Sequence, residues 1–226
     1  MYTDQVVGRL STYRRILLDH QRRGKNRIFS HEIAELGGFT PAQVRRDIMT
    51  IGYNGSPARG YEVAGLITRI GQVLDCPGGC SFALVGVGHL GQAVLAYFDG
   101  RNPYLRIGVA FDIDPKYVGK AIHGCPCHSM DALERVIERE RIRMAVLAVP
   151  AAAAQEVTDR LVAAGVNAIL NFVPARLNVP DGVYVEHVDI TVSLERVAFR
   201  SRVNAAERQE VGPGPCEEFH VSIGHA

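Results

Sequence analysis

Apolar residues recur every three to four positions through the first 75 residues, a spacing typical of amphipathic helices. A Thr-Pro pair at position 40 marks one helix start, because threonine caps and proline suits the first helical position. The pattern predicts a helix over Leu10–Gln21, an extended piece at Arg27–Ser30, a helix capped by Ser30 that ends at Gly37-Gly38, a helix from Thr40-Pro41 to Gly52, and a connecting helix over Glu62–Asp75. With the Gly- and Pro-containing loop Tyr53–Gly60, this order is typical of a winged helix-turn-helix.

The pattern changes after the breaker Cys76-Pro-Gly-Gly-Cys80, which we interpret as a domain boundary. Short continuous apolar runs now alternate with helical periodicity, as in a parallel, doubly wound sheet of the Rossmann-like α/β class. The predicted strands are Phe82–Val85, Ile107–Phe111, Met144–Val149, Ala168–Asn171 and Val183–Val188, and the predicted helices between them are His89–Phe98, Ser129–Arg141 and Ala152–Ala164.

A final helix is predicted from Ile190 to about Glu210, and its apolar residues occupy more than one face. One small sheet can cover only one face of a helix, so a second subunit is expected to cover the other. We therefore predict a homodimer in which this C-terminal helix is exchanged. The expected domains are 1–75 for DNA binding, 76–188 for a nucleotide, 189–211 for dimerisation and 212–226 as a loose tail.

The run Ser81–Val85 stops in Gly86-Val87-Gly88-His89-Leu90-Gly91, a Gly-x-Gly-x-x-Gly turn, and Asp112 ends the next apolar run. In such a turn the three glycines permit a tight reversal, close approach of a pyrophosphate and close helix packing. The helix N-terminus attracts phosphate. A carboxylate at Asp112 accepts ribose hydroxyls and repels a 2′-phosphate, so NADH and NAD+ are favoured over the phosphorylated forms. A glycine-rich turn that holds no ligand is the alternative.

Residues 1–75 carry 11 Lys and Arg against 7 Asp and Glu, whereas residues 76–226 carry 14 against 17. A basic first third suits a partner with phosphates. The third predicted helix offers Gln43, Arg45 and Arg46 to a major groove, and the loop offers Arg59. The alternative is an ordinary helical subdomain with solvated arginines.

The cysteine residues and the hydropathy of the chain indicate its cellular compartment and whether a metal cofactor is expected. Five cysteines form no secreted-domain framework, no apolar window spans a membrane and no signal-peptide core is present, so a cytoplasmic protein is expected. His123-Gly-Cys-Pro-Cys127-His128 has metal-ligand residue types, but Cys-x-Cys in a short loop fits zinc spacing poorly. We expect ordinary core or loop cysteines and no metal.

Taken together, these motifs resemble the Rex family of redox-sensing transcriptional repressors. The resemblance runs from about Leu10 to Arg200. It rests on Thr40-Pro-Ala-Gln-Val-Arg-Arg-Asp47, Arg59-Gly-Tyr61, the glycine turn through Ala93, Phe111-Asp-Ile-Asp-Pro115, Ala148-Val-Pro150 with Ala154-Gln155, Ile169-Leu-Asn-Phe172 and Arg176-Leu-Asn-Val-Pro-Asp-Gly182. The segment Ile48-Met-Thr-Ile-Gly52 departs from the family's usual Leu-Ser-Tyr-Phe-Gly.

The resemblance implies a homodimer that binds palindromic operator DNA when NADH is low and releases it when NADH binds. It adds Ile113, Val149 and Pro150 to the expected cofactor contacts and Tyr61 to the expected DNA contacts. It also implies that Arg15, Tyr97 and Asp189 couple the two sites.

An apolar pocket disfavours the cationic ring of NAD+ and accepts the neutral ring of NADH. We expect Tyr97 and Phe172 beside that ring. Two other classes stay open: a small NAD-dependent oxidoreductase with an N-terminal helical adaptor domain, and an adaptor that senses nucleotide through protein contacts. About 40 residues after the last strand are few for a substrate domain.

Overall fold

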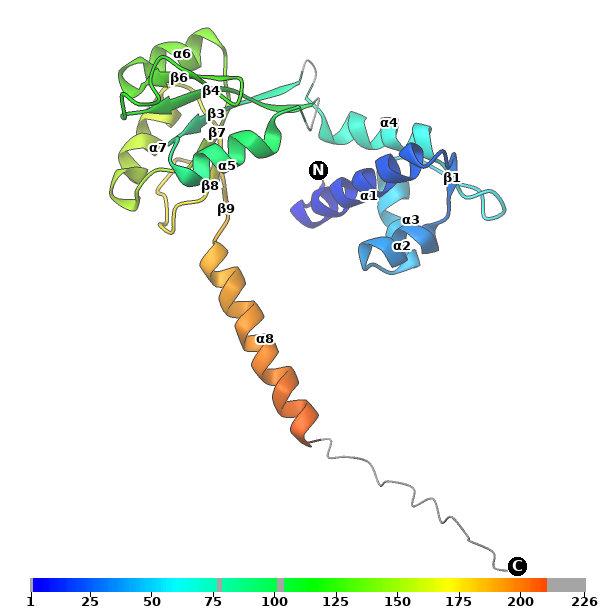
Figure 1. The fold of residues 1–226 in the computed structure, drawn as a ribbon. Helices are drawn as coiled ribbons and strands as arrows, with labels where there is room; N and C mark the ends of the chain where they lie inside the picture. The colour runs from blue at the N-terminus through cyan, green and yellow to red at the C-terminus, as the bar shows by residue number, and fades with distance from the viewer. Residues whose placement is uncertain (1, 77–78, 101–103, 211–226) are drawn as a thin grey trace, which may run out of the picture. The chain divides into compact units, whose positions relative to one another are not determined.

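Residue contacts divide the chain near Cys80 (Figure 1). The structure, a computed structural model, describes residues 2–76, 79–100 and 104–210. One unit runs to Cys80 and takes in residues 104–106, and the other holds the rest. The predicted first domain ends at residue 75, five residues before this division. The predicted loose tail lies outside the described residues.

The first unit is a small helical domain with a two-stranded wing. Its elements are α1 (Asp4–Arg22), β1 (Arg27–Ile28), α2 (Ser30–Gly37), α3 (Pro41–Thr50), β2 (Tyr61–Glu62) and α4 (Val63–Leu74). Strands β1 and β2 are antiparallel, with Ile28 opposite Tyr61. The core holds the apolar residues that set the sequence periodicity, among them Leu10, Tyr13, Leu17, Ile33, Val44, Ile48, Leu66 and Ile70. This is the winged helix-turn-helix that the sequence predicted.

Two helix starts in this unit differ from the prediction. Helix α1 begins at Asp4, six residues earlier, because Thr3 caps it and its oxygen accepts from the Val6 N–H. Helix α2 is not capped by Ser30, which is its first residue. Instead the Glu32 carboxylate accepts from the Phe29 N–H at 2.7 Å, a cap that hydrophobic periodicity does not reveal.

The second unit carries a seven-stranded sheet in the order β5-β6-β4-β3-β7-β8-β9. Its strands are β3 (Cys80–Val85), β4 (Leu105–Asp112), β5 (Ala121–Ile122), β6 (Cys125–Ser129), β7 (Met144–Leu147), β8 (Ala168–Asn171) and β9 (Tyr184–His187), and its α-helices are α5 (His89–Phe98), α6 (Leu133–Arg139), α7 (Ala154–Ala163) and α8 (Ile190–Glu210). Without the short antiparallel β5, the order is that of a Rossmann sheet, with its switch point between β3 and β7.

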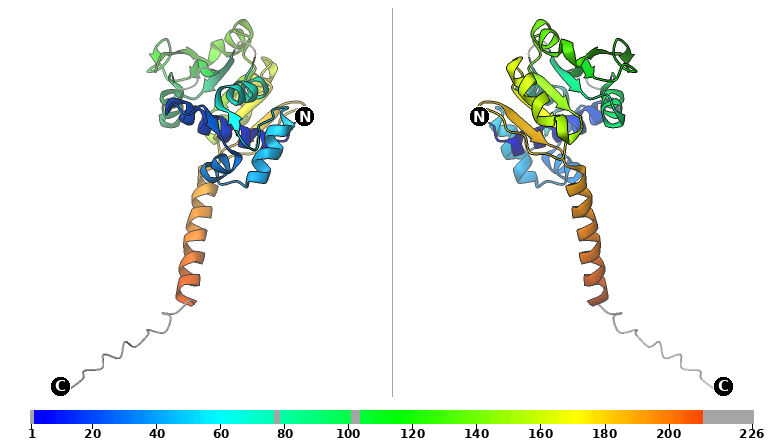
Figure 2. Two further views of the ribbon diagram at one scale, coloured as in Figure 1. Left: turned by 90° about the vertical axis from the view of Figure 1, so that its right-hand side faces the viewer. Right: turned by 90° about the vertical axis from the view of Figure 1, so that its left-hand side faces the viewer.

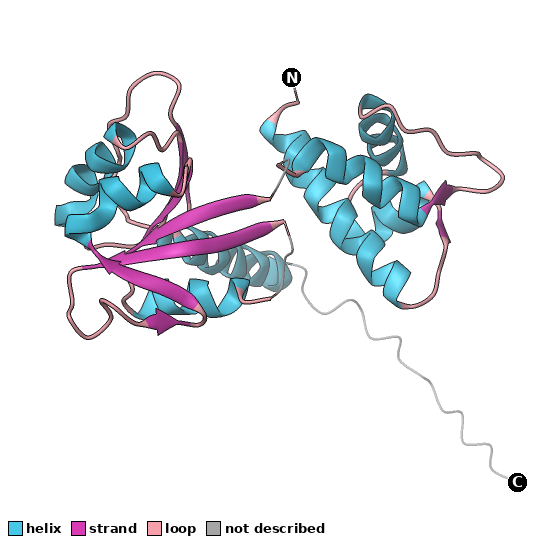
Figure 3. Cartoon of the chain, turned by 90° about the horizontal axis from the view of Figure 1, so that it is seen from above, coloured by secondary structure: helices cyan, strands magenta, loops and turns pink. Residues whose placement is uncertain are grey.

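Helices lie on both faces of this sheet (Figure 3). Successive side chains of a strand point to opposite faces of the sheet, so alternate residues pack into two separate hydrophobic cores. Ala83 and Val85 pack in one core with α6 and α7, whereas Leu84 packs in the other with α5. The chain crosses from β3 to β4 in one direction and from β7 to β8 in the other, so right-handed crossovers place the connecting helices on opposite faces.

Several predicted elements needed correction. Strands β5 and β6 were missed, and Cys125 and Cys127 lie in β6 rather than in a loop. The Pro and the alternating polar residues hide this strand from a pattern search. Strand β7 ends at Leu147, two residues earlier than predicted. The segments Met130–Ala132 and Ala151–Ala153 are short 3-10 turns ahead of α6 and α7.

Cys76 and Cys80 form a disulfide, with their Cα atoms 5.6 Å apart. No sequence pattern indicated this pairing, since a separation of four residues is compatible with many loop conformations. Cys125 and Cys127 are the free cysteines of the described residues, and both are buried. No helix among the described residues is long and apolar enough to cross a membrane.

Helix α8 is a single uninterrupted helix (Figure 2) with little cover from its own chain. Its large apolar residues are between 38% and 67% exposed: Ile190, Val192, Leu194, Val197 and Phe199. These residues occupy the faces that the sequence marked as apolar. These apolar side chains can be buried only if a surface other than this chain packs against α8.

Candidate functional site

The glycine turn between β3 and α5 is built from contacts that only glycine permits. Gly86 has φ +96°, and a Cβ there would overlap the Ala148 carbonyl at the end of β7. A Cβ on Gly91 would overlap the Gly86 carbonyl, so α5 packs directly against the turn. Gly88 differs, because nothing lies within 4 Å of a Cβ there. It leaves open space at the N-terminus of α5, where a phosphate group would approach.

Asp112, at the end of β4, is tied to this turn through both carboxylate oxygens. Oδ2 accepts from the Val87 N–H at 2.6 Å, and Oδ1 accepts from the Asp114 N–H at 2.8 Å. The carboxylate is only half-buried, so each oxygen keeps a lone pair for a further donor. The structure therefore brings the predicted acid and the predicted turn together. Ile113 beside it is 83% exposed, an apolar surface next to the acid.

The other side of the switch point is formed by the segments that follow β7 and β8. Ala148 donates its N–H to Val85, and Phe172 donates its N–H to Leu147, which draws both segments to the end of β3. Val149 is half-buried and Pro150 is exposed. Phe172 packs against the core that contains Val87. These residues share one edge of the sheet with the glycine turn.

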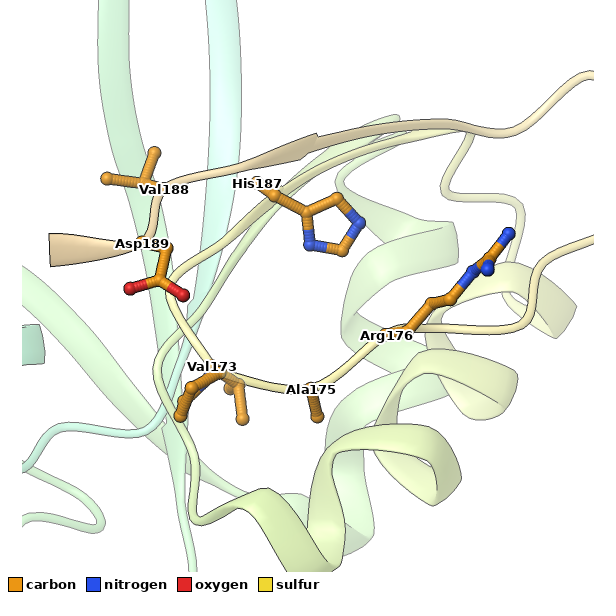
Figure 4. Close-up of a pocket in the computed structure, with 7 residues that line it drawn as sticks. Val173, Ala175, Arg176, His187, Val188 and Asp189 are labelled. Atoms are coloured by element: carbon orange, nitrogen blue, oxygen red, sulfur yellow. The ribbon is translucent and has the colours of Figure 1, made fainter. Parts of the chain in front are cut away.

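A pocket of about 400 Å³ lies beside this edge, between the ends of β8 and β9 and the start of α8. Figure 4 shows the side chains around it, with Arg176 and His187 from opposite sides. The buried amide of Asn171 contacts three of the residues that line this pocket. Its Nδ2 donates to the carbonyls of Val173 and Ala175 at 3.1 Å, and it lies 3.1 Å from His187 Nδ1. Sequence analysis gave Asn171 no role, although a polar residue at the end of a buried strand was the available signal.

Asp189 lines the same pocket and caps α8, because its Oδ1 accepts from the Val192 N–H at 3.0 Å. Tyr97 is 60% exposed on α5, and its ring meets Phe98 edge-on with centroids 5.3 Å apart. Arg15 is exposed on α1 and belongs to the other unit. The predicted coupling of Arg15 with Tyr97 and Asp189 therefore stays a prediction.

In the first unit, Arg45 and Arg46 are exposed on α3, and Arg59 is exposed in the wing. Thr40 accepts from the Gln43 N–H at 3.2 Å and so fixes the start of α3. Arg45 donates to the Ser30 hydroxyl at 3.2 Å, which holds its guanidinium beside the start of α2. Three arginine side chains are thus exposed to solvent, two on α3 and one in the wing.

A groove of about 380 Å³ runs between α2, α3 and the wing, and it is lined by Ser30, His31, Arg45, Ser56 and Tyr61 among others. Tyr61, a predicted DNA contact, lines this groove, and its contact with DNA stays a prediction. Its side chain is only 7% exposed and belongs to the core, and burial raises the pKa of its hydroxyl. Its place in β2, opposite the buried Ile28, makes it a support of the wing.

The two thiols of β6 offer little chemistry at neutral pH. Burial raises the pKa of Cys125 to about 12, with a further contribution from Cys127. Burial and the Asp112 charge raise the pKa of Cys127 to about 11. Both groups are therefore thiols rather than nucleophilic thiolates. Among the described residues, no cluster of three His, Cys, Asp or Glu could hold a metal ion.

Comparison with known proteins agrees with this division. The family described as "Putative DNA-binding protein N-terminus" matches residues 3–48, and the family described as "CoA binding domain" matches residues 80–175. The redox-sensing transcriptional repressor Rex of Roseiflexus sp. (strain RS-1) is 39% identical over 196 residues, which cover 87% of this chain and 89% of the relative.

Three solved structures of RSP, a Rex-family repressor, are 31% identical to this chain. The complex with β-NADH superposes with a TM-score of 0.79 and covers 92% of this chain and 98% of its own. The complex with β-NAD+ and operator DNA superposes with a TM-score of 0.82 and covers 95% and 99%. The winged helix, the glycine turn with its acid and these likenesses over nearly the whole length lead to one assignment: the chain belongs to the Rex family of redox-sensing transcriptional repressors.

Proposed function

We propose that this protein is an NADH-responsive repressor that binds a palindromic operator when NADH is low and leaves it when NADH binds. The observation that carries the proposal is the pairing of the Asp112 carboxylate with the glycine turn in a chain that also presents Arg45 and Arg46 on a recognition helix. One unit supplies a dinucleotide site and the other supplies cations for DNA. Neither feature alone would indicate regulation.

The adenosine half of the ligand would lie on the turn. Gly88 leaves room for the pyrophosphate at the start of α5, and the free lone pairs of Asp112 accept the two ribose hydroxyls. The adjacent side chain of Ile113 offers an apolar contact to the adenine. Coenzyme A shares an adenosine diphosphate group with NAD, but its 3′-phosphate would approach the same carboxylate. We therefore infer NADH and NAD+ as the ligands.

The nicotinamide half would lie toward Phe172 and the pocket at the start of α8. That pocket is lined by Val173, Pro174 and Val188, whose apolar groups accept a neutral dihydronicotinamide ring more readily than a cationic ring. A ligand shifts a two-state equilibrium only by its differential affinity for the states. Near-complete release from operator DNA, a shift from 1:99 to 99:1, needs a difference of about 5.5 kcal/mol.

The binding-competent form is proposed to be a homodimer joined through α8. The exposed apolar residues of this helix, such as Leu194 and Phe199, support that partner, and exchange of the helix would cover both of its faces. A dimer also presents two recognition helices, as a palindrome requires, with half-sites about 34–36 Å apart or a multiple of that spacing. We infer that the protein acts in the cytoplasm, where its operator is, and that it catalyses no reaction.

The test is a gel-shift titration of palindromic operator DNA at one salt concentration, with NADH, NAD+ and coenzyme A compared. NADH should lower the affinity for DNA much more than NAD+, and coenzyme A should have no effect. The double variant Arg45→Ala, Arg46→Ala should lose operator binding while it still binds NADH. Arg135→Ala with Arg139→Ala removes two exposed arginines from α6 and serves as the matched control. Equal operator binding with and without NADH would exclude the proposal.

A further inference from the structure

Helix α3, which presents Arg45 and Arg46, is joined to α1 through the buried carboxylate of Asp47. The Asp47 side chain is 5% exposed and that of Arg9 is 17% exposed. Arg9 donates from Nε to Oδ2 at 2.6 Å and from Nη2 to Oδ1 at 2.8 Å. Two parallel hydrogen bonds between a guanidinium and a carboxylate fix the direction of both groups as well as their distance.

Tyr13, one turn further along α1, holds the same carboxylate. Its hydroxyl donates to Oδ2 of Asp47 at 2.9 Å, and its ring is fully buried, with the Phe39 ring edge-on to it at a centroid distance of 5.3 Å. Burial raises the pKa of the Tyr13 hydroxyl, and the hydrogen bond to Asp47 raises it further, so the group keeps its proton at neutral pH. Both carboxylate oxygens are therefore held from α1.

The direction of the Asp47 side chain determines where the neighbouring arginines point. An α-helix turns by about 100° per residue, so the angles between Asp47, Arg46 and Arg45 around the axis of α3 are fixed. A rotation of about 20° around that axis would move a group 5–6 Å from it by about 2 Å. A side chain that reads a base must be held to within about 0.5 Å. The rotation of α3 is therefore critical for base contacts.

The apolar contacts of α3 supply less of this directional control. Val44 and Ile48 are fully buried in the core of the first unit, and they hold the helix against it. The hydrophobic effect is non-directional, so these contacts tolerate small rotations better than a bidentate pair does. The hydrogen bonds to Asp47 are thus the contacts best suited to fix the rotation of the helix.

We propose that Arg9 and Tyr13 are positioning residues for operator recognition: by holding Asp47, they set the rotation of α3 at which its arginines reach base edges in the major groove. This inference rests on the proposed function. Other DNA attracts the same arginines through its phosphates, which carry no sequence information. The contacts to Asp47 therefore determine the preference for operator over other DNA, rather than the affinity for DNA in general.

The experiment uses Arg9→Lys in the full chain, which keeps the positive charge and removes the planar fork. Affinities for operator DNA and for a non-operator duplex of equal length are measured without NADH, at one salt concentration and a temperature at which circular dichroism shows each variant folded. The ratio of the two affinities should fall by about 5-fold or more, as when a bidentate base contact is lost. The affinity for the non-operator duplex should not change.

Two further variants complete the comparison. Tyr13→Phe keeps the buried ring and removes only the donor to Asp47, so the affinity ratio should fall in the same direction. This variant carries the test if Arg9→Lys does not fold. Arg23→Lys is the matched control, because Arg23 forms an exposed ion pair with Asp19 on the same helix, and it should leave both affinities unchanged.

An unchanged affinity ratio in folded Arg9→Lys and Tyr13→Phe overturns the proposal. Equal losses for operator and non-operator DNA also overturn it, because a structural role alone does not alter the preference between them. If the parent protein shows no preference for the operator, the proposed function fails instead. Hydrogen exchange of the α3 amides in the free protein then tests the positioning separately: faster exchange in both variants supports it, and unchanged exchange overturns it.

Discussion

The carboxylate of Asp112 accepts a hydrogen bond from the backbone N–H of Val87, with 2.6 Å between oxygen and nitrogen. The two residues lie 25 positions apart, and the bond joins the acid at the end of β4 to the turn at the end of β3. The hydrogen bond thus joins the two parts of the proposed dinucleotide site. A turn held in place in this way lowers the entropy cost of ordering it when a ligand binds.

Asp112→Ala should weaken NADH binding by about 10-fold or more, because it removes a charge-assisted acceptor of the ribose hydroxyls. The ratio of the NADH affinity to the NADPH affinity should also fall, since the carboxylate no longer repels a 2′-phosphate. Fluorescence titration with both nucleotides measures the two effects. Glu138→Gln removes an exposed carboxylate from α6 and should change neither affinity. An unchanged NADH affinity for Asp112→Ala would remove this residue from the site.

Two glycines of the turn should respond differently to alanine. Gly91→Ala places a Cβ against the Gly86 carbonyl and should lower stability by about 1–3 kcal/mol, seen as a lower Tm. Gly88→Ala meets nothing within 4 Å, and its φ of −66° suits alanine, so its Tm should stay unchanged. NADH affinity should nevertheless fall for Gly88→Ala, because the methyl group enters the space of the pyrophosphate. Normal NADH binding by this variant would contradict the predicted ligand position.

Asp47 should be a major contributor to the stability of the first unit. Its carboxylate, 5% exposed, accepts from Arg9 Nε at 2.6 Å and from the Tyr13 hydroxyl at 2.9 Å. Asp47→Asn leaves the Arg9 charge without its partner, and a buried pair broken in this way costs about 3–5 kcal/mol. Calorimetry of the full chain should show a lower Tm for the transition of this unit. Asp19→Asn, in an exposed pair with Arg23, is the matched control and should change little.

The same carboxylate predicts a pH dependence. Burial raises the pKa of Asp47, but the hydrogen bonds from Arg9 and Tyr13 outweigh burial and hold the pKa below its ordinary value of 3.8. A depressed pKa stabilises the fold above the ordinary value, and this stability is lost as pH falls below 3.8. Unfolding measured between pH 6 and acid should therefore show a larger loss for the parent protein than for Asp47→Asn. Parallel losses would mean that Asp47 is not the titrating group.

Helix α8 should hold the dimer together. Leu194→Asp with Phe199→Asp places charges on apolar residues that are 64% and 54% exposed in the single chain. If a second subunit buries them, the charges should shift the protein to monomer in light scattering at micromolar concentration. Ser201→Asp, at an exposed polar position of the same helix, is the matched control and should leave the dimer intact. A double variant that remains dimeric would rule out this interface.

The sequence by itself determined the order of elements and the identity of the central motif. Glycine spacing and an acid at the end of the next apolar run are local constraints, so Gly86, Gly91 and Asp112 could be read from the chain alone. The helices with strong periodicity were predicted for the same reason. The predicted α5, for example, has the bounds of the structure, His89–Phe98.

Only the tertiary structure decided which residues meet. No local pattern encodes the distances between segments. These distances decide the Asp112–Val87 hydrogen bond, the contact of Asn171 with His187 and the pairing of Cys76 with Cys80. Most of the Tyr61 side chain likewise lies in the core, which the sequence did not indicate. Side-chain periodicity records which face of an element is apolar, but the fold alone sets what that face touches, because packing joins residues that lie far apart in the chain.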